Sequence, residues 1–447
     1  MIESLKKKML KKLNEIFKSR DLNQVIITLI LRVIGILLLF CFTLFLTNNY
    51  KPEVVGDYEL IRTFLLIIGS LTVLGTEQSI LYFIGKLTSS NSLEMSLSKL
   101  YFNILKLIFI SSLCLVFIFI ILPKDLILDF YNRDHLIYNY IKKSVFLCFF
   151  YSVTVFNTEM LRALNYINLS EIFRNILKYS IVIIGSMILL YTGDSIWLID
   201  FYIYGFIILS IISTIVVLID INKKDRFKNY HKIEFDDSLV SIKSIIIKSY
   251  PMAISGLCFF VMLSVDIMLL KKYFGSESVA YYSIAIKLLT ILSMVIIAVN
   301  INIAPKISEF YHSNKTYELK EILNKSRKII CFMNIPIGIF LILFGKKVLL
   351  FFGQNYLEVY YPMIILLIGQ IIASFFGSTA ITLNMIGQQN RFQFILLFAT
   401  LLNIIFNIIL TPKYGMIGSA ISFVVSLLFW NIVSFITFIK SSKLNTL

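Results

Sequence analysis

The sequence predicts an all-α polytopic membrane protein, with about 12 transmembrane helices of roughly 20 residues each. Two observations of composition carry this prediction. The chain has 447 residues, of which 58% are hydrophobic and only 15% are charged, and its mean hydropathy is +0.84. In addition, apolar stretches long enough to cross a bilayer recur along the whole chain, separated by mostly short loops. This composition excludes a soluble domain of enzyme size.

The first two predicted spans carry charges inside apolar sequence. Residues 24–47 contain Arg32, and residues 58–84 contain Arg62 near their start and Glu77 near their end. Counted from the same side, Arg32 and Glu77 both lie roughly 11 to 12 Å deep. A charge near a helix centre costs on the order of 2.5 to 3.5 kcal/mol, so we expect each to face a partner or a water-filled cavity. Arg32 and Glu77 could therefore hold two helices in register, Arg32 could snorkel to the headgroups, or both could line a cavity that binds a polar ligand.

The remaining spans divide six plus six around a polar central stretch. They are predicted at residues 98–122, 141–162, 170–191, 196–220, 244–270, 278–304, 326–350, 358–384, 391–411 and 415–439. The resulting organisation is an N-lobe of helices 1 to 6 over 23–221, a cytoplasmic linker over 222–243, a C-lobe of helices 7 to 12 over 244–440 and a cytoplasmic tail over 441–447. Two equivalent halves are typical of secondary transporters, whose site lies near the midplane between them.

The N-terminal residues 1–22 place apolar side chains at helical spacing with lysines around the rest, which predicts a basic amphipathic helix on the membrane surface. A cleaved signal peptide is disfavoured, because the apolar run that follows is too long and lacks a small-x-small site. Lysine and arginine concentrate in the loops on one side, which predicts a multi-pass protein of the cytoplasmic (inner) membrane with both termini cytoplasmic. The net charge of +16 then indicates attraction to anionic lipid. Nucleic-acid binding is disfavoured because the lysines are dispersed.

Further charged and polar residues lie inside predicted spans. Several cations at comparable depth favour a shared anion-binding cavity over independent snorkelling. The polar residues could line this cavity or hold helices together. The predicted cavity cations are Arg32, Arg62, Lys106 and Lys287; the cavity acids are Glu77 and Asp266; and the polar cavity residues are Gln78, Asn300, Asn384, Asn403 and Asn407.

No catalytic or metal-binding pattern is found in the sequence. The five cysteines fall inside apolar segments without ligand spacing, and the three histidines lie far apart in loops. The sequence therefore predicts a protein that is not an enzyme and has no metal site or cofactor.

Two stretches of the chain resemble a known family. Residues 264–311 resemble the seventh and eighth helices of oligosaccharide flippases of the Wzx type, and residues 383–432 match the family pattern more closely. In the second stretch Asn403 and Asn407 precede Pro412, Tyr414, Gly415, Gly418 and Ala420. The start of the first span, with Arg32, Val33 and Gly35, resembles helix 1 of the lipid II flippases. The chain is identified as a member of the polysaccharide biosynthesis transporters within the MATE-like flippase superfamily.

The resemblance implies alternating access between two six-helix lobes around a central cationic cavity. The implied ligand is an oligosaccharide linked through diphosphate to a polyprenol and moved from the cytoplasmic to the outer face, for surface polysaccharide such as capsule, lipopolysaccharide O-antigen or a teichoic-type polymer. The predicted cavity cations would bind the diphosphate. Glu77 and Asp266 would neutralise them or bind a coupling proton or sodium ion. The expected partners are membrane lipids and a polymerase and chain-length regulator of the same pathway.

Two alternatives stay open. The first is a MATE-like exporter of drugs or metabolites. Such exporters use a carboxylate in the first helix, whereas residues 24–47 contain an arginine and no acid. The second is a membrane glycosyltransferase or polymerase, which needs acidic residues in sizeable outer loops. The loop at 123–140 carries Asp125, Asp129 and Asp134 but no companion constellation.

Overall fold

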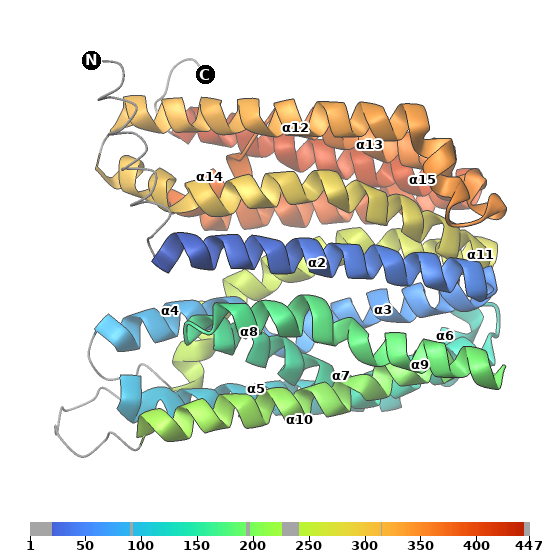
Figure 1. Ribbon diagram of the computed structural model, residues 1–447, viewed down its shortest axis with the longest axis horizontal. Helices are drawn as coiled ribbons and strands as arrows, with labels where there is room; N and C mark the ends of the chain where they lie inside the picture. The colour runs from blue at the N-terminus through green and yellow to red at the C-terminus, as the bar shows by residue number, and fades with distance from the viewer. Residues whose placement is uncertain (1–19, 90–92, 194–196, 226–240, 314, 442–447) are drawn as a thin grey trace. The chain divides into compact units, whose positions relative to one another are not determined.

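The computed structural model describes residues 20–89, 93–193, 197–225, 241–313 and 315–441, and all elements in these ranges are helical (Figure 1). The first half contains α2 Arg20–Asn49, α3 Pro52–Val73, α4 Thr76–Ser89, α5 Leu93–Ile121, α6 Lys124–Phe130, α7 His135–Ala163, α8 Ile167–Ile172, the π-helical turn η1 Phe173–Leu177, α9 Lys178–Thr192 and α10 Leu198–Asp225. The second half contains α11 Ile242–His312, α12 Thr316–Leu350, η5 Gln354–Val359, α13 Tyr360–Ser374, α14 Thr379–Met385 and α15 Gln389–Ser441. The all-α membrane fold predicted from composition is confirmed.

Two helices are much longer than a membrane is thick. At about 1.5 Å per residue, α11 would extend for roughly 105 Å, whereas the hydrocarbon core is about 30 Å across. Each contains one glycine in the left-handed region, Gly275 in α11 (φ 80°) and Gly415 in α15 (φ 55°). Glycine adopts this conformation without steric cost. Each long helix therefore holds two successive spans.

The number of spans follows from these breaks. The described residues contain 9 helices that are long and apolar enough to cross a membrane, or 10 when α3 and α4, bent by 41° at their junction, count as one broken span. Leu74 and Gly75 both have positive φ at that junction. Dividing α11 and α15 at their glycines adds two more spans. The result is consistent with the twelve that the sequence predicts.

By its contacts the chain divides into two compact units, each assembled from three segments. Unit 1 comprises Met1–Phe45, Thr72–Phe119 and Val145–Met252, and unit 2 comprises Leu46–Leu71, Ile120–Ser144 and Ala253–Leu447. The predicted lobe boundaries remain a prediction. Three predicted segments lie wholly or partly outside the described residues. They are the surface helix through residue 19, the linker over 226–240 and the tail from residue 442 on.

Unit 1 has a core of apolar side chains from α4, α5, α7 and α10. On α5 the buried residues recur three or four positions apart, which places them on one helical face. Leu97, Leu100, Ile104 and Ile108 follow this pattern, and all four are fully buried. They pack with Ile80 of α4 in the same core. The apolar periodicity of α5 thus determines which face is buried in this unit.

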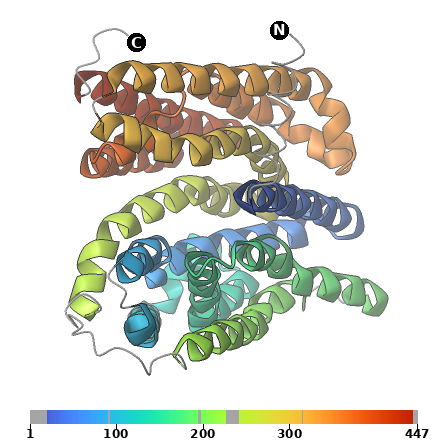
Figure 2. The same ribbon diagram turned by 60° about the vertical axis from the view of Figure 1, so that its left-hand side comes forward.

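Unit 2 contains a second core, which includes Ile307 of α11, Leu319 of α12, Leu383 of α14 and Phe438 of α15. Within this unit α13 contacts both α12 and α15, and α14 contacts α15. Figure 1 and Figure 2 both show α12, α13 and α15 running alongside one another. The short α14 follows a turn after α13 and therefore breaks the predicted span 358–384 into two helices.

A glycine on α3 permits a close approach to α11 within unit 2. A Cβ built on Gly56 would lie 1.8 Å from the carbonyl oxygen of Ser276. Any side chain at this position would push the two helices apart. The approach brings the neighbouring acids of α3 next to the lysines of α11.

We expect Gly56→Ala to lower the free energy of unfolding by about 1 to 3 kcal/mol, because the added methyl group overpacks this contact. Gly85→Ala is the matched control. Gly85 lies in α4 with nothing within 4 Å of an added Cβ, and alanine there gains about 0.5 to 1 kcal/mol over glycine. The melting temperature of the purified protein in detergent measures both. A Gly56→Ala variant as stable as Gly85→Ala would contradict the close approach.

Candidate functional site

Two cations of unit 2 converge on one fully buried carboxylate, Glu59 of α3. Lys287 of α11 donates from Nζ to Glu59 Oε1 at 2.5 Å, and Arg62 donates from Nε to Oε2 at 2.8 Å. The side chain of Glu59 is 0% exposed, whereas those of Lys287 and Arg62 are 6% and 19% exposed. Arg62 lies one turn after Glu59 on the same helix, so α3 supplies both members of that pair. We call these three residues the Glu59 cluster.

The charges of the Glu59 cluster explain why α3 and α11 are held together. Moving an ion from water into the protein interior costs several kcal/mol, which only well-placed opposite charges and hydrogen bonds offset. Each carboxylate oxygen of Glu59 accepts a bond from a different cation. The three side chains carry a formal charge of +1. The cluster therefore concentrates positive charge inside an apolar helical unit.

A second group, the Lys271 cluster, joins three segments of unit 2. Lys271 Nζ donates to Asp57 Oδ1 and to Asp134 Oδ2 at 3.0 Å each, and to Ser276 Oγ at 2.5 Å. Ser276 in turn donates from Oγ to Asp57 Oδ1. Asp57 lies two residues before Glu59. The α3 segment therefore contacts α11 on both sides of the kink at Gly275.

Asp134 also caps a helix. Its Oδ1 accepts hydrogen bonds of 3.1 Å from the backbone N–H groups of Leu136 and Ile137, at the start of α7, as an N-terminal carboxylate does. Burial alone would raise the pKa of Asp134, but the hydrogen bonds from Lys271 and the backbone, with the charge of Lys271, lower that pKa below its usual value. Asp134, which has no companion nearby in the sequence, is therefore bonded to Lys271, 137 residues away.

A third group, the Asp266 cluster, surrounds a fully buried carboxylate with neutral donors. Tyr282 donates from its hydroxyl to Asp266 Oδ2 at 2.9 Å, and Asn407 donates from Nδ2 to Oδ1 at 2.6 Å. Thr411 donates to Asn407 Oδ1, and Asn407 Nδ2 also reaches the backbone oxygen of Asn403. Within the described ranges no cation lies within ion-pair distance of Asp266. The structure therefore brings together three of the predicted site residues, Asp266, Asn403 and Asn407.

In unit 1 the partner of Arg32 is Glu171. Arg32 donates from Nε to Oε2 at 3.1 Å and from its terminal nitrogen to Oε1 at 2.8 Å, the planar two-point geometry typical of arginine and carboxylate. Asn175, in the π-helical turn, donates to the same Oε2 at 2.8 Å. Of the three interpretations of Arg32 and Glu77, the structure does not show a direct pair, since Arg32 is bonded to Glu171.

Arg32 does not meet Glu77 because of the rotational positions of the two side chains around their helices. Counting residues gives depth in a membrane but not the face of the helix, and the break at Leu74 and Gly75 redirects α4, which carries Glu77. The buried Oε2 of Glu77 has no hydrogen-bond partner among the residues that the structure describes. Its other oxygen contacts Gln78 at 3.5 Å.

The other predicted site residues lie outside these clusters. Lys106 and Gln78 are exposed, and Asn300 and Asn384 are half-buried. Conversely, sequence reasoning missed Glu59, Glu171 and Lys271. A signal for Glu59 was present, since a carboxylate three residues before Arg62 shares its helical face. The other two partners are 139 and 214 residues away in sequence, so no local pattern marks them.

Helices long and apolar enough to cross a membrane, repeated along the chain, define a polytopic membrane protein. The family model described as "Polysaccharide biosynthesis protein" matches residues 22–311, and the chain belongs to this family. A second model, MatE, matches residues 251–409. A curated relative, the capsular polysaccharide biosynthesis protein CapF of Staphylococcus aureus, is 26% identical over 199 residues, 44% of this chain and 50% of the relative. The match thus spans about half the length of that relative.

Two solved membrane-protein structures share the fold. An inward-facing multidrug resistance MATE family transporter matches with a TM-score of 0.73 at 16% identity, covering 94% of this chain and 99% of that one. The lipid II flippase MurJ in an inward closed conformation matches with a TM-score of 0.71 at 16% identity, covering 94% and 88%. The chain therefore belongs to the polysaccharide biosynthesis protein family and shares the fold of these two solved proteins. The resemblance read from the sequence is confirmed.

We expect Glu59→Gln to lower the free energy of unfolding by about 3 to 5 kcal/mol, because it leaves buried cations without their carboxylate. The double variant Glu59→Gln with Lys287→Met should recover most of this loss, since it removes both members of the pair. Melting temperatures in detergent measure the effect.

The control for the Glu59 cluster is Glu53→Gln, in the exposed first turn of the same helix. It should change the free energy of unfolding by no more than about 0.5 kcal/mol. If the double variant loses as much free energy of unfolding as the two single variants together, the result would argue against the buried pair.

Proposed function

We propose that the protein moves a polyprenyl-diphosphate-linked oligosaccharide from the cytoplasmic to the outer face of the membrane by alternating access, for the synthesis of a cell-surface polysaccharide. Three findings support the proposal. The chain belongs to the polysaccharide biosynthesis protein family, its curated relative is named for capsular polysaccharide biosynthesis, and its fold is shared with a lipid II flippase.

The physical need for such a protein comes from the glycan. Each hydroxyl costs on the order of a few kcal/mol to bury without a partner, so an oligosaccharide headgroup cannot cross the hydrocarbon core unaided. A polar path through the protein removes this cost, while the prenyl chain stays in lipid. The diphosphate adds negative charge, which needs cations along that path.

The Glu59 cluster is the observation that carries the proposal. Lys287 and Arg62 are held inside the unit by a carboxylate, and a diphosphate offers the same charge-assisted acceptors in greater number. Exchange of Glu59 for the diphosphate would free the cations for substrate without leaving them unpaired. Arg32, held by Glu171, would act in the same way. Lys106, on the exposed surface of unit 1, remains a proposed fourth contact.

The Asp266 cluster supports a proposal for coupling. A buried carboxylate with neutral donors only is neutralised most simply by a proton or a small cation. Asp266, with the amide groups of Asn403 and Asn407 beside it, would bind a coupling proton or sodium ion, and Glu77 would serve similarly in unit 1. We place the protein in the cytoplasmic membrane with both termini cytoplasmic, beside a polymerase and chain-length regulator.

The alternative is a MATE-like exporter of drugs or metabolites, which the MatE match over 251–409 keeps open. An exporter of cationic compounds needs a carboxylate on their path. In this chain the buried acids Glu59 and Glu171 are each bonded to arginine or lysine, whereas Asp266 is bonded to neutral donors and is assigned here to the coupling ion. This favours an anionic substrate.

The test is deletion of the gene and extraction of polyprenyl-diphosphate glycans. We expect loss of the surface polysaccharide and accumulation of lipid-linked oligosaccharide that faces the cytoplasm. Wild type should restore export. Lys287→Gln should restore less than about a tenth of it at equal membrane abundance, as expected for loss of a charged hydrogen bond worth roughly 1.5 to 3 kcal/mol.

Two further variants make this test specific. Lys287→Arg keeps the charge and should retain part of the activity, and Lys413→Gln removes an exposed lysine and should export normally. If the surface polysaccharide is unchanged by the deletion and cationic toxins accumulate instead, the protein is an exporter.

A further inference from the structure

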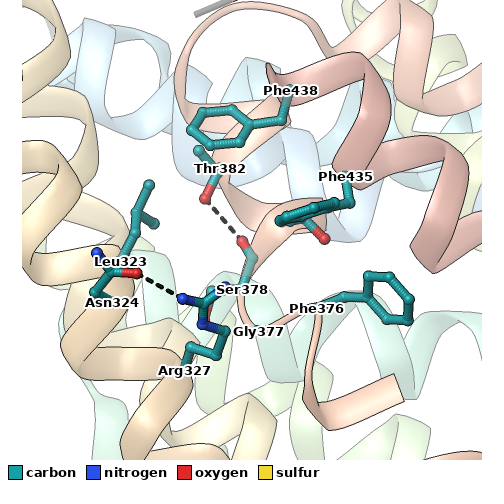
Figure 3. A pocket seen from close by; sticks show the side chains of 10 residues that line it. Leu323, Asn324, Arg327, Phe376, Gly377, Ser378, Thr382, Phe435 and Phe438 are labelled. Atoms are coloured by element: carbon teal, nitrogen blue, oxygen red, sulfur yellow. Dashed lines mark hydrogen bonds between the residues drawn. The ribbon is translucent and has the colours of Figure 1, made fainter. Parts of the chain in front are cut away.

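A small pocket within unit 2 shares no residue with the Glu59, Lys271 and Asp266 clusters. Its walls come from α12, from the turn between α13 and α14, from the first residues of α14, and from the last turns of α15. Its volume is about 20 Å³, and it is partly open to its surroundings. A water molecule needs roughly 10 to 15 Å³. The enclosed part of the pocket therefore accepts one oxygen-sized group of a ligand, and the rest of that ligand stays at the mouth of the pocket. Figure 3 shows Arg327 reaching from α12 toward the turn at Gly377 and Ser378.

One side of the pocket carries a cation without a carboxylate partner and two hydroxyl groups without an acceptor, among the residues that the structure describes. Arg327 donates to Asn324 Oδ1 at 2.8 Å, and no carboxylate in the described part of the chain lies within ion-pair distance of it. Ser378 and Thr379 are 4% and 6% exposed. Among the described residues their side-chain oxygens have no hydrogen-bond partner. A buried hydroxyl without a partner costs about 1 to 3 kcal/mol, so the pocket is built for a group that accepts.

The opposite side is apolar. The rings of Phe376 and Phe435 lie edge to face with centroids 5.8 Å apart, and Phe438 completes this wall. Figure 3 shows Phe435 and Phe438 on the α15 side, across Ser378 and Thr382 from Arg327. A ligand that fills the mouth therefore meets a cation at one end and aromatic rings at the other, which is the chemistry of an amphiphile.

The backbone around Gly377 positions the arginine. Gly377 has φ +64°, and a Cβ built on it would lie 3.2 Å from Cβ of Arg327. Glycine therefore allows this turn to approach α12 beside the arginine. The contact fixes the stem of Arg327 rather than leaving it free at the surface.

The surrounding charge is also positive. The first turns of α12 carry Lys325 and Lys328, both exposed, besides Arg327, against Glu318 and Glu321. Arg327 comes eleven residues after the start of α12, or about 16 Å along the helix. The orientation predicted from the loop lysines places this end of α12 at the cytoplasmic surface, where anionic lipid headgroups lie.

We propose that the pocket binds a phosphate group, namely the phosphodiester of an anionic glycerophospholipid. One phosphoryl oxygen enters the pocket and accepts from Arg327 and from the hydroxyls of Ser378 and Thr379. The glycerol and acyl chains extend along the phenylalanine wall. Neither the glycan nor the proposed flipping takes part, so the two proposals fail independently.

The test is native mass spectrometry of the purified full-length protein. Dioleoylphosphatidylglycerol is the probe, dioleoylglycerol is the same lipid without phosphate, and inorganic phosphate is the soluble source. Arg327→Gln should weaken retention of the phospholipid roughly tenfold, as expected for a lost charged hydrogen bond. Ser378→Ala with Thr379→Val, which removes the hydroxyls and leaves the charge, should weaken it by about threefold or more.

Lys328→Gln is the matched control. It removes the same charge from the next position of α12, where the side chain is exposed, and should change phospholipid retention by less than about twofold. Arg327-dependent binding of inorganic phosphate without the lipid would support a phosphate site with a soluble occupant. Equal effects of Arg327→Gln and Lys328→Gln, or equal retention of dioleoylglycerol, would overturn the proposal and leave the pocket as a water-filled gap.

Discussion

The burial of Glu59 between Lys287 and Arg62 is the interaction on which the arrangement around α3 and α11 depends. A carboxylate that is 0% exposed needs a hydrogen-bonding partner at each oxygen, and at Glu59 both partners are cations. That requirement fixes which faces of α3 and α11 touch. It also keeps two cations inside an apolar unit, where a lone lysine or arginine would be expelled to the surface.

The glycines of α3 and α11 make this pairing geometrically feasible. Gly56 lets the backbone of α3 approach Ser276, and the left-handed Gly275 turns α11 between Lys271 and Lys287. One short segment of α3 therefore presents Asp57 to the first lysine and Glu59 to the second. Both ion-pair clusters depend on the same helical approach. A substitution at Gly56 would consequently disturb two charge networks at once.

The fold was readable from the sequence because membrane spans are defined by length and apolarity. The two long helices show the limit of that reading, since the predicted loops near Gly275 and Gly415 are single left-handed residues within otherwise helical backbone. The candidate site was predicted less completely than the fold. Depth along a helix can be counted. Of the charges selected in this way, Arg32, Lys287 and Asp266 are buried or partly buried, whereas Lys106 is exposed.

Which charges meet is set by rotation and by long-range packing, and neither follows from counting. Arg32 therefore bonds to Glu171 rather than to Glu77. Asp134, which looked isolated in its loop, bonds to a lysine from the other half of the chain. Glu59 alone carried a local signal, its spacing from Arg62 on one helical face.

The central claim is that Glu59 and the substrate's diphosphate compete for the same cations. Calorimetric titration of the purified protein with geranyl diphosphate, with geraniol as the control that lacks the diphosphate, tests it most directly. If the carboxylate competes, Glu59→Gln binds geranyl diphosphate more tightly than wild type does, and Lys287→Gln binds it more weakly. Unchanged or weaker binding by Glu59→Gln would contradict the exchange and leave the Glu59 cluster as a structural ion pair.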